Sequence, residues 1–99
     1  MDYNITQKQF ILEIIHIQSL VFKILPYFEE EYEYLDEYFE SVLQRLGGIN
    51  IVLKNPPEIL SVIALVELAR TTKSKSKIRK LVLDACGILD KIKESDPNA

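Results

Sequence analysis

Residues 28–46, FEEEYEYLDEYFESVLQRL, decide the fold. Their apolar side chains recur at alternating intervals of four and three, which is the spacing of one face of an α-helix. These side chains are Phe28, Tyr32, Leu35, Phe39, Val42 and Leu46. Gly47 and Gly48 follow, and glycine adopts the left-handed conformation at a helix C-terminus without steric cost. The stretch therefore predicts a helix over residues 27–46.

Upstream, the sequence predicts a helix over residues 6–25. Thr6 and Gln9 have the spacing of a capping box, in which each side chain bonds the backbone of the other residue. An apolar stripe follows at spacings of four and three: Phe10, Ile14, Ile17, Val21 and Ile24. Pro26 disfavours an α conformation at Leu25, so we expect it to end or sharply kink this helix.

Downstream, two more helices are predicted. Asn55 with Pro56, Pro57 and Glu58 is typical of a helix start and predicts a helix over residues 56–70 that is apolar on every side. A basic run then leads into a helix over residues 75–94, and residues 49–54 are interpreted as a buried connection. Residues 95–99 are expected to fray. The prediction is one all-α domain over residues 1–99, a four-helix bundle completed by dimerisation.

Length and composition exclude several classes of protein. A chain of 99 residues holds one domain, and 47% hydrophobic with 27% charged residues is an ordinary globular composition. One Cys cannot form an internal disulfide, which indicates a reducing, cytoplasmic compartment. The longest nearly uninterrupted apolar run, residues 59–66, is too short to span a bilayer, so no membrane role is expected.

Apolar positions outside the predicted stripes indicate a homodimer. Ile11, Ile15 and Phe22 widen the apolar arc of the first helix beyond what one neighbour covers. Leu83 points away from the stripe of the last helix. We expect these four side chains to form the dimer interface.

The charge is unevenly distributed along the chain. Residues 1–50 carry three basic side chains against nine acids, and residues 51–99 carry nine against six. Such asymmetry fits internal pairing, a head-to-tail contact between copies, or a basic face for nucleic acid. The candidate anion or nucleic-acid site comprises Arg70, Lys73, Ser74, Lys75, Ser76, Lys77, Arg79 and Lys80. The alternatives are a solvated turn or a turn that faces the acidic helix.

Part of this region resembles a helix-turn-helix. Leu68–Thr72 followed by Ser74–Leu81 resembles the stretch in DNA-binding families where a helix ends in Leu-Ala and a Ser-rich recognition helix follows. The resemblance covers residues 57–83 and implies that Ser74, Lys75, Ser76, Arg79 and Lys80 face the major groove. Lys73 stands where those families usually have Gly. A dimer binding duplex DNA is the function that the resemblance implies.

A second candidate surface combines tyrosines with acids. Tyr27, Tyr34 and Tyr38 lie to one side of the stripe of the second predicted helix, with Glu30 and Glu37 among them. Tyrosine is enriched in protein interfaces, and the surrounding acids suit a basic protein partner. The alternative is that the rings flank the core with their hydroxyls in water.

No pattern indicates catalysis. His16 is a single histidine on the polar side of the first helix, and Cys86 has no His nearby in the sequence. The acids lack the Glu-x-x-His pairs of di-iron bundles, so no metal, cofactor or small-molecule substrate is expected. We therefore expect a non-catalytic interaction or regulatory module that binds a macromolecule. The alternatives are the dimeric DNA-binding regulator and an immunity or antitoxin-type protein that neutralises a basic partner.

Overall fold

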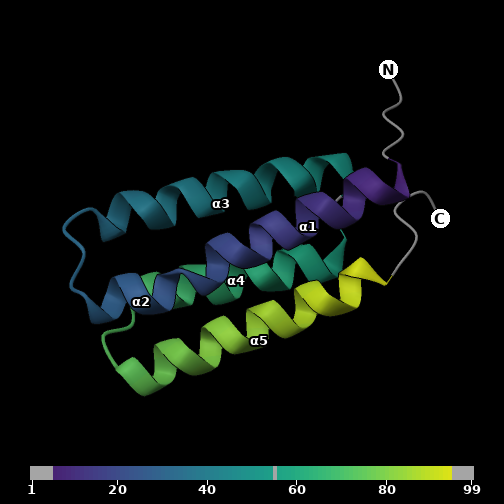
Figure 1. Ribbon diagram of the computed structural model, residues 1–99. Coiled ribbons are helices and arrows are strands. Elements are labelled where there is room, and N and C mark those ends of the chain that lie inside the picture. The colour runs from purple at the N-terminus through teal and green to yellow at the C-terminus, as the bar shows by residue number, and fades with distance from the viewer. Residues whose placement is uncertain (1–5, 55, 95–99) are drawn as a thin grey trace.

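The computed structural model describes residues 6–54 and 56–94 (Figure 1). Those residues form five helical segments and no strand: α1 Gln7–Phe22, α2 Ile24–Glu29, α3 Leu35–Val52, α4 Pro57–Thr71 and α5 Lys75–Lys93. The prediction of an all-helical fold is confirmed. The Asn55 cap and the frayed tail at residues 95–99 lie outside the described residues.

The helices lie side by side in an elongated molecule of 41 × 22 × 20 Å. α5 packs against α4 and α1, and α3 packs against α4 (Figure 1). Each long helix buries an apolar stripe toward a common core. The largest fully buried side chains include Phe10, Ile14, Leu46, Ile59 and Leu89. The chain thus forms its core by joining one face from every helix.

The first helix begins as predicted and ends earlier. Gln9 N–H donates to Thr6 Oγ1 over 3.1 Å, and Thr6 N–H donates to Gln9 Oε1 over the same distance, which completes the capping box. α1 ends at Phe22 rather than at residue 25. Pro26 has no N–H to donate to the Phe22 carbonyl, and its ring crowds that oxygen. α2 then starts with Pro26 in its first turn.

The predicted helix over residues 27–46 is wrong in its first half, because α2 ends at Glu29 and α3 begins at Leu35. Between them the chain reverses direction, whereas the sequence predicted a break only at Pro26. Tyr32 N–H donates to the Tyr27 carbonyl over 3.0 Å, the bond of a Schellman motif, and Glu31 has a left-handed φ of 54°. A continuous helix would stack Glu29, Glu33 and Glu37 at i, i+4 spacing, where like charges repel.

Gly47 and Gly48 do not end α3, which corrects the second prediction about this helix. Both have negative φ, and the helix continues to Val52. Burying Ile49 contributes roughly 1.5–3 kcal/mol, comparable with the roughly 1 kcal/mol that each helical Gly costs. The left-handed residue at the end of α3 is Lys54, with φ 64°. Residues 49–52 are therefore the last turn of α3 and not a connection.

α4 and α5 agree with the predicted helices over residues 56–70 and 75–94 to within one residue. The inner face of α4 is buried through Ile59, Val62 and Val66. Its outer face is not covered, since Leu60 and Leu68 are 49% and 54% exposed. The helix is therefore apolar all round but enclosed by this chain on one side only.

Residues Gln7–Glu29, comprising α1 and α2, are long and apolar enough to cross a membrane by length and composition, with a mean hydropathy of 1.4. A core helix of a soluble protein passes the same test, and Phe10, Ile14 and Ile17 of this segment lie in the core. Length and composition alone therefore do not assign the segment to a membrane.

Candidate functional site

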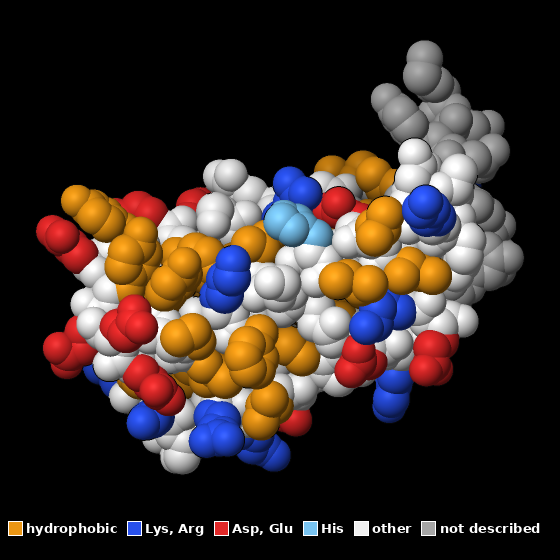
Figure 2. Space-filling view, viewed as in Figure 1, with side chains coloured by type: hydrophobic (Ala, Val, Ile, Leu, Met, Phe, Trp, Pro, Cys, Tyr) orange, Lys and Arg blue, Asp and Glu red, His pale blue; other side chains and the backbone are white. Residues whose placement is uncertain are grey.

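The predicted acidic and basic stretches meet at one end of the molecule. The end of α2, the reversal at residues 30–34, the start of α3, the end of α4 and the start of α5 all lie there (Figure 1). Figure 2 shows acidic side chains around hydrophobic ones at this end, on the left of the view. We call it the acidic end and define it by Tyr27, Tyr32, Tyr34, Tyr38, Phe28, Leu35, Glu29, Glu30, Glu31, Glu33 and Glu37.

Four tyrosine rings form a continuous row at the acidic end. The ring centroids of Tyr38 and Tyr27 lie 4.8 Å apart in a T-shaped contact, those of Tyr27 and Tyr32 lie 4.8 Å apart, and those of Tyr32 and Tyr34 lie 5.9 Å apart. Aromatic pairs at such separations attract one another beyond simple burial. The row runs from a half-buried Tyr38 to Tyr32 and Tyr34, which are 41% and 55% exposed.

Tyr38 anchors the row to the core. Its hydroxyl donates to the Leu20 carbonyl of α1. Burial raises the pKa of Tyr38 to about 12, and the neighbouring Tyr27 contributes to the same shift. The phenol therefore stays protonated well above neutral pH, so its hydrogen bond to α1 is kept.

Sequence reasoning found this surface incompletely. The rings of Tyr27 and Tyr38 are in direct contact, whereas the ring of Tyr34 joins the row through Tyr32. Tyr32 was assigned to the core stripe, because the interruption between α2 and α3 was missed. The like charges at i, i+4 spacing were the signal that could have revealed the interruption. Glu30, the C-cap of α2, and Glu37, in the first turn of α3, are both exposed as expected.

A hollow of about 410 Å³ opens beside the tyrosine row. Its lining combines apolar side chains, two carboxylates and one ammonium: Phe28, Tyr32, Leu35, Glu29, Glu31 and Lys75. Lys75 Nζ lies 3.5 Å from Glu29 Oε1, and the Lys75 side chain is largely exposed. Long basic side chains pack an apolar stem against such surfaces while the charged head stays near water or a carboxylate. The hollow suits that kind of side chain.

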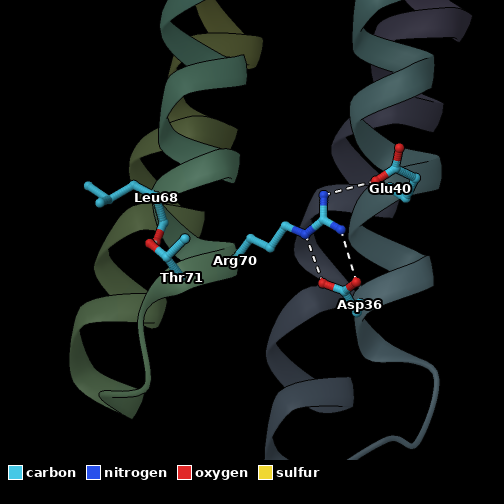
Figure 3. Close-up of polar contacts among 5 residues, drawn as sticks. All are labelled: Asp36, Glu40, Leu68, Arg70 and Thr71. Carbon is cyan, nitrogen blue, oxygen red and sulfur yellow. Dashed lines mark hydrogen bonds and ion pairs between the residues drawn. The ribbon is translucent and has the colours of Figure 1, made fainter.

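Arg70 is bonded to carboxylates of the same chain. Its Nε and Nη2 donate to Asp36 Oδ1 and Oδ2 over 2.8 and 2.9 Å, and its Nη1 donates to Glu40 Oε2 over 2.9 Å (Figure 3). The hydrogen bond from Arg70 lowers the pKa of Asp36. This fork ties the end of α4 to the start of α3. The first residue of the predicted anion site is therefore held by acids of the same chain.

Several carboxylates at the acidic end remain without a cation. Within residues 6–54 and 56–94, the ion pairs of this end use Asp36, Glu40 and Glu29. The exposed carboxylates outside these pairs belong to Glu30, Glu31, Glu33 and Glu37. The acidic end thus keeps a surplus of negative charge after its internal pairing.

The rest of the predicted anion site lies at the turn between α4 and α5. Ser74 and Ser76 hydroxyls are 3.2 Å apart, and the Thr72 hydroxyl donates to the Leu68 carbonyl over 2.7 Å. The remaining cations are exposed: Lys73, Lys77, Arg79 and Lys80. α4 and α5 lie side by side and run in opposite directions (Figure 1), whereas the helices of a helix-turn-helix cross steeply. α5 is packed against the core from Ile78 onward.

The two residues considered for catalysis lie apart from the acidic end. His16 is exposed on α1, and Cys86 is half-buried on α5 with its Sγ 3.9 Å from the Gln18 carbonyl. Burial raises the pKa of Cys86 to about 11, with a contribution from Asp90. Thiolate is the nucleophilic form, so this thiol is weakly reactive at neutral pH. In the described part of the chain no group of three His, Cys, Asp or Glu residues is placed to hold a metal ion.

The predicted dimer-interface residues remain at the surface of this chain. Ile15, Phe22 and Leu83 are exposed, and Ile11 is half-buried. A polar contact joins α1 and α5, in which the Gln18 amide donates to Asp90 Oδ1 over 2.8 Å.

Comparison with known proteins gives no match. No family model matches the sequence, and no curated protein or solved structure matches the chain. Function is therefore inferred from the residues of this chain alone.

Proposed function

We propose that this protein is a non-catalytic binding module, working as a homodimer, whose acidic end holds a basic segment of a macromolecular partner. The observation that carries the proposal is the tyrosine row beside the exposed carboxylates of Glu30, Glu31, Glu33 and Glu37, which form no ion pair within residues 6–54 and 56–94. Exposed Tyr32 and Tyr34 offer large contact areas with polar tips, and rigid aromatic side chains lose little entropy on binding.

A Lys or Arg side chain of the partner enters the hollow between α2 and α5. Its stem packs on Phe28 and Leu35, and its charged head lies near Glu29 and Glu31. The face of Tyr32 adds a cation–π attraction. The head group replaces Lys75, whose 3.5 Å contact with Glu29 is loose and solvent-exposed and therefore contributes little.

The carboxylates around the hollow attract the partner before contact. Glu30, Glu33 and Glu37 are exposed, and charges of one sign on one end of a molecule raise the rate of encounter with an oppositely charged partner. This chemistry suits a regulator or an immunity or antitoxin-type protein that neutralises a basic protein. We place that activity in the cytoplasm, where a thiol such as Cys86 stays reduced.

Charge reversal at the acidic end tests the proposal. An arginine-rich peptide is titrated into the protein by calorimetry at low and at physiological salt. We expect binding that weakens with salt and that falls at least about tenfold in Glu31→Lys with Glu33→Lys, because two attractive charges become repulsive. Asp84→Lys with Glu94→Lys is the matched control. This double variant makes the same change in net charge, but at a position within α5 and at the C-terminal end of that helix.

Equal loss of affinity in both double variants would show that only net charge matters, and would overturn a defined site at the acidic end. Tyr34→Ala supplies an independent measure, because it removes an exposed ring without changing charge. We expect it to weaken the peptide about threefold to tenfold, as an interface tyrosine does.

The DNA-binding alternative is favoured by the exposed cations Lys73, Lys77, Arg79 and Lys80 at the start of α5. It is weakened by the acidic end beside them and by the antiparallel packing of α4 and α5. Duplex DNA at low salt separates the two functions. Binding that disappears in Lys77→Glu with Arg79→Glu would support the DNA-binding alternative, and absence of binding would eliminate it.

A further inference from the structure

We propose that the outer face of α4 is the dimer interface, covered by the same face of a second copy with the two-fold axis at Ala64. Seven residues make up this face: Pro57, Leu60, Ser61, Ala64, Glu67, Leu68 and Thr71. All seven are exposed. At 3.6 residues per turn they span about 120° of the helix circumference, centred on Ala64.

The face is apolar although no helix within residues 6–54 and 56–94 covers it. Leu60 and Leu68 are each about half exposed, and Ala64 lies between them at i, i+4 spacing. Glu67 is the single charge among the seven residues. The outer positions of α5, by contrast, include Lys77, Lys80 and Lys91. A solvated helix face normally carries charges of that kind, so the outer face of α4 fits contact with protein better than contact with water.

The order of residues on this face is self-complementary. We consider two copies of α4 that pack antiparallel with Ala64 at the crossing point. A residue that lies n positions before Ala64 in one copy then contacts the residue that lies n positions after Ala64 in the other copy. Leu60 therefore meets Leu68, and Pro57 meets Thr71. Ser61 meets Glu67, which pairs a hydroxyl donor with a carboxylate acceptor.

This pairing identifies a second copy as the occupant. The only charge on the face meets a hydroxyl and never a like charge, and each such contact occurs twice across the axis. The small side chain of Ala64 at the crossing point lets the helices approach to the short end of the usual separation of about 8–10 Å.

The inference specifies the dimer of the proposed function and does not depend on the acidic end. Two copies joined along the outer faces of α4 leave the tyrosine row and Glu31 uncovered, since those lie on α2, the reversal and α3. Each monomer then keeps its own peptide site. A monomeric chain would remove the dimer from the proposed function but leave the peptide site at the acidic end standing, and the two are measured separately.

Replacing Ala64, which lies on the proposed two-fold axis, by a charged residue tests the interface. Sedimentation velocity across micromolar concentrations is expected to show a dimer for the wild-type chain and a monomer for Ala64→Glu. The dissociation constant should rise at least about a hundredfold, because two carboxylates would face each other at the axis. Ala64→Lys should likewise be monomeric. An equal mixture of the two variants should dimerise again, because opposite charges then meet.

Leu83→Glu is the matched control, because Leu83 is exposed on α5 and belongs to the interface expected from the sequence. We expect this variant to stay dimeric. A monomeric wild-type chain, or a dimer that survives Ala64→Glu, would overturn the inference. Circular dichroism checks that each variant keeps its helices, and peptide binding by the Ala64→Glu monomer shows whether the acidic end works independently.

Discussion

Within the described part of the chain, two residues other than glycine hold the left-handed backbone that ends a helix. Glu31 follows α2 with φ 54°, and Lys54 follows α3 with φ 64°. For a residue with a Cβ this conformation costs roughly 1–2 kcal/mol. At Glu31 it is held by the hydrogen bond from Tyr32 to Tyr27 and by the contact between the same two rings. The strained residue lies in the lining of the hollow that we assign to the partner.

Glu31→Gly is expected to raise the free energy of unfolding by about 0.5–1 kcal/mol, because relief of the left-handed strain exceeds the added freedom of the unfolded chain. Urea denaturation measures the change. Glu30→Gly is the matched control, since Glu30 has a right-handed φ of −82° and should lose stability. Loss of stability in both variants would show that residue 31 is not held in the left-handed conformation.

Tyr38→Phe should lower the free energy of unfolding by about 1 kcal/mol at neutral pH, because the Leu20 carbonyl loses its donor. The pKa of Tyr38 is raised in the folded state to about 12. Its contribution is therefore complete below pH 10, the ordinary tyrosine value, and is lost as the pH rises toward 12. The difference in urea midpoint between the wild-type and Tyr38→Phe proteins should therefore become smaller as the pH rises from 10 toward 12. A constant gap would contradict the burial of this phenol.

At the scale of the helix, burial of apolar side chains extends α3 past two glycines that would be expected to end it. Gly47 and Gly48 have open space where a Cβ would be, and both lie in helical backbone. Gly47→Ala and Gly48→Ala should each raise the free energy of unfolding by about 0.5–1 kcal/mol. Thermal unfolding followed by circular dichroism measures this. Replacing a glycine in a left-handed cap by alanine would instead lower the free energy of unfolding. Destabilisation by both variants would therefore support the helix end at Gly47 and Gly48 that the sequence predicts.

The helices with local signals were predictable, and those shaped by tertiary contacts were not. The capping box of Thr6 and the prolines at the start of α4 are properties of neighbouring residues, so the starts of α1 and α4 follow from the sequence. The break between α2 and α3 was hidden, because Phe28 and Leu35 keep helical spacing across a reversal that Glu31 makes without glycine. The like charges of Glu29, Glu33 and Glu37 at i, i+4 spacing were a local sign of the break, and the packing of α3 back along the other helices shows where the chain turns.

At the scale of the whole molecule, part of the charge asymmetry is accounted for by ion pairs within the chain. Arg70 binds Asp36 and Glu40, and Lys75 approaches Glu29. Composition offered internal pairing, contact between copies and nucleic-acid binding as alternatives, and could not choose among them because the choice depends on which helix ends meet. Part of the candidate site was recognisable from the sequence, namely Tyr27, Tyr34, Tyr38, Glu30 and Glu37, whereas Tyr32 was assigned to the core stripe. The hollow was not, since it joins α2 and α5 across residues distant in the chain.

The most direct test of the central claim is to map where a basic peptide binds. Titration of an arginine-rich peptide into the isotopically labelled protein, followed by amide chemical shifts, should move resonances of residues 27–37 and Lys75 and leave those of the outer face of α4 unchanged. This pattern would locate the partner at the acidic end. Shifts confined to other helices, or no shifts at low salt, would contradict the assignment of this surface.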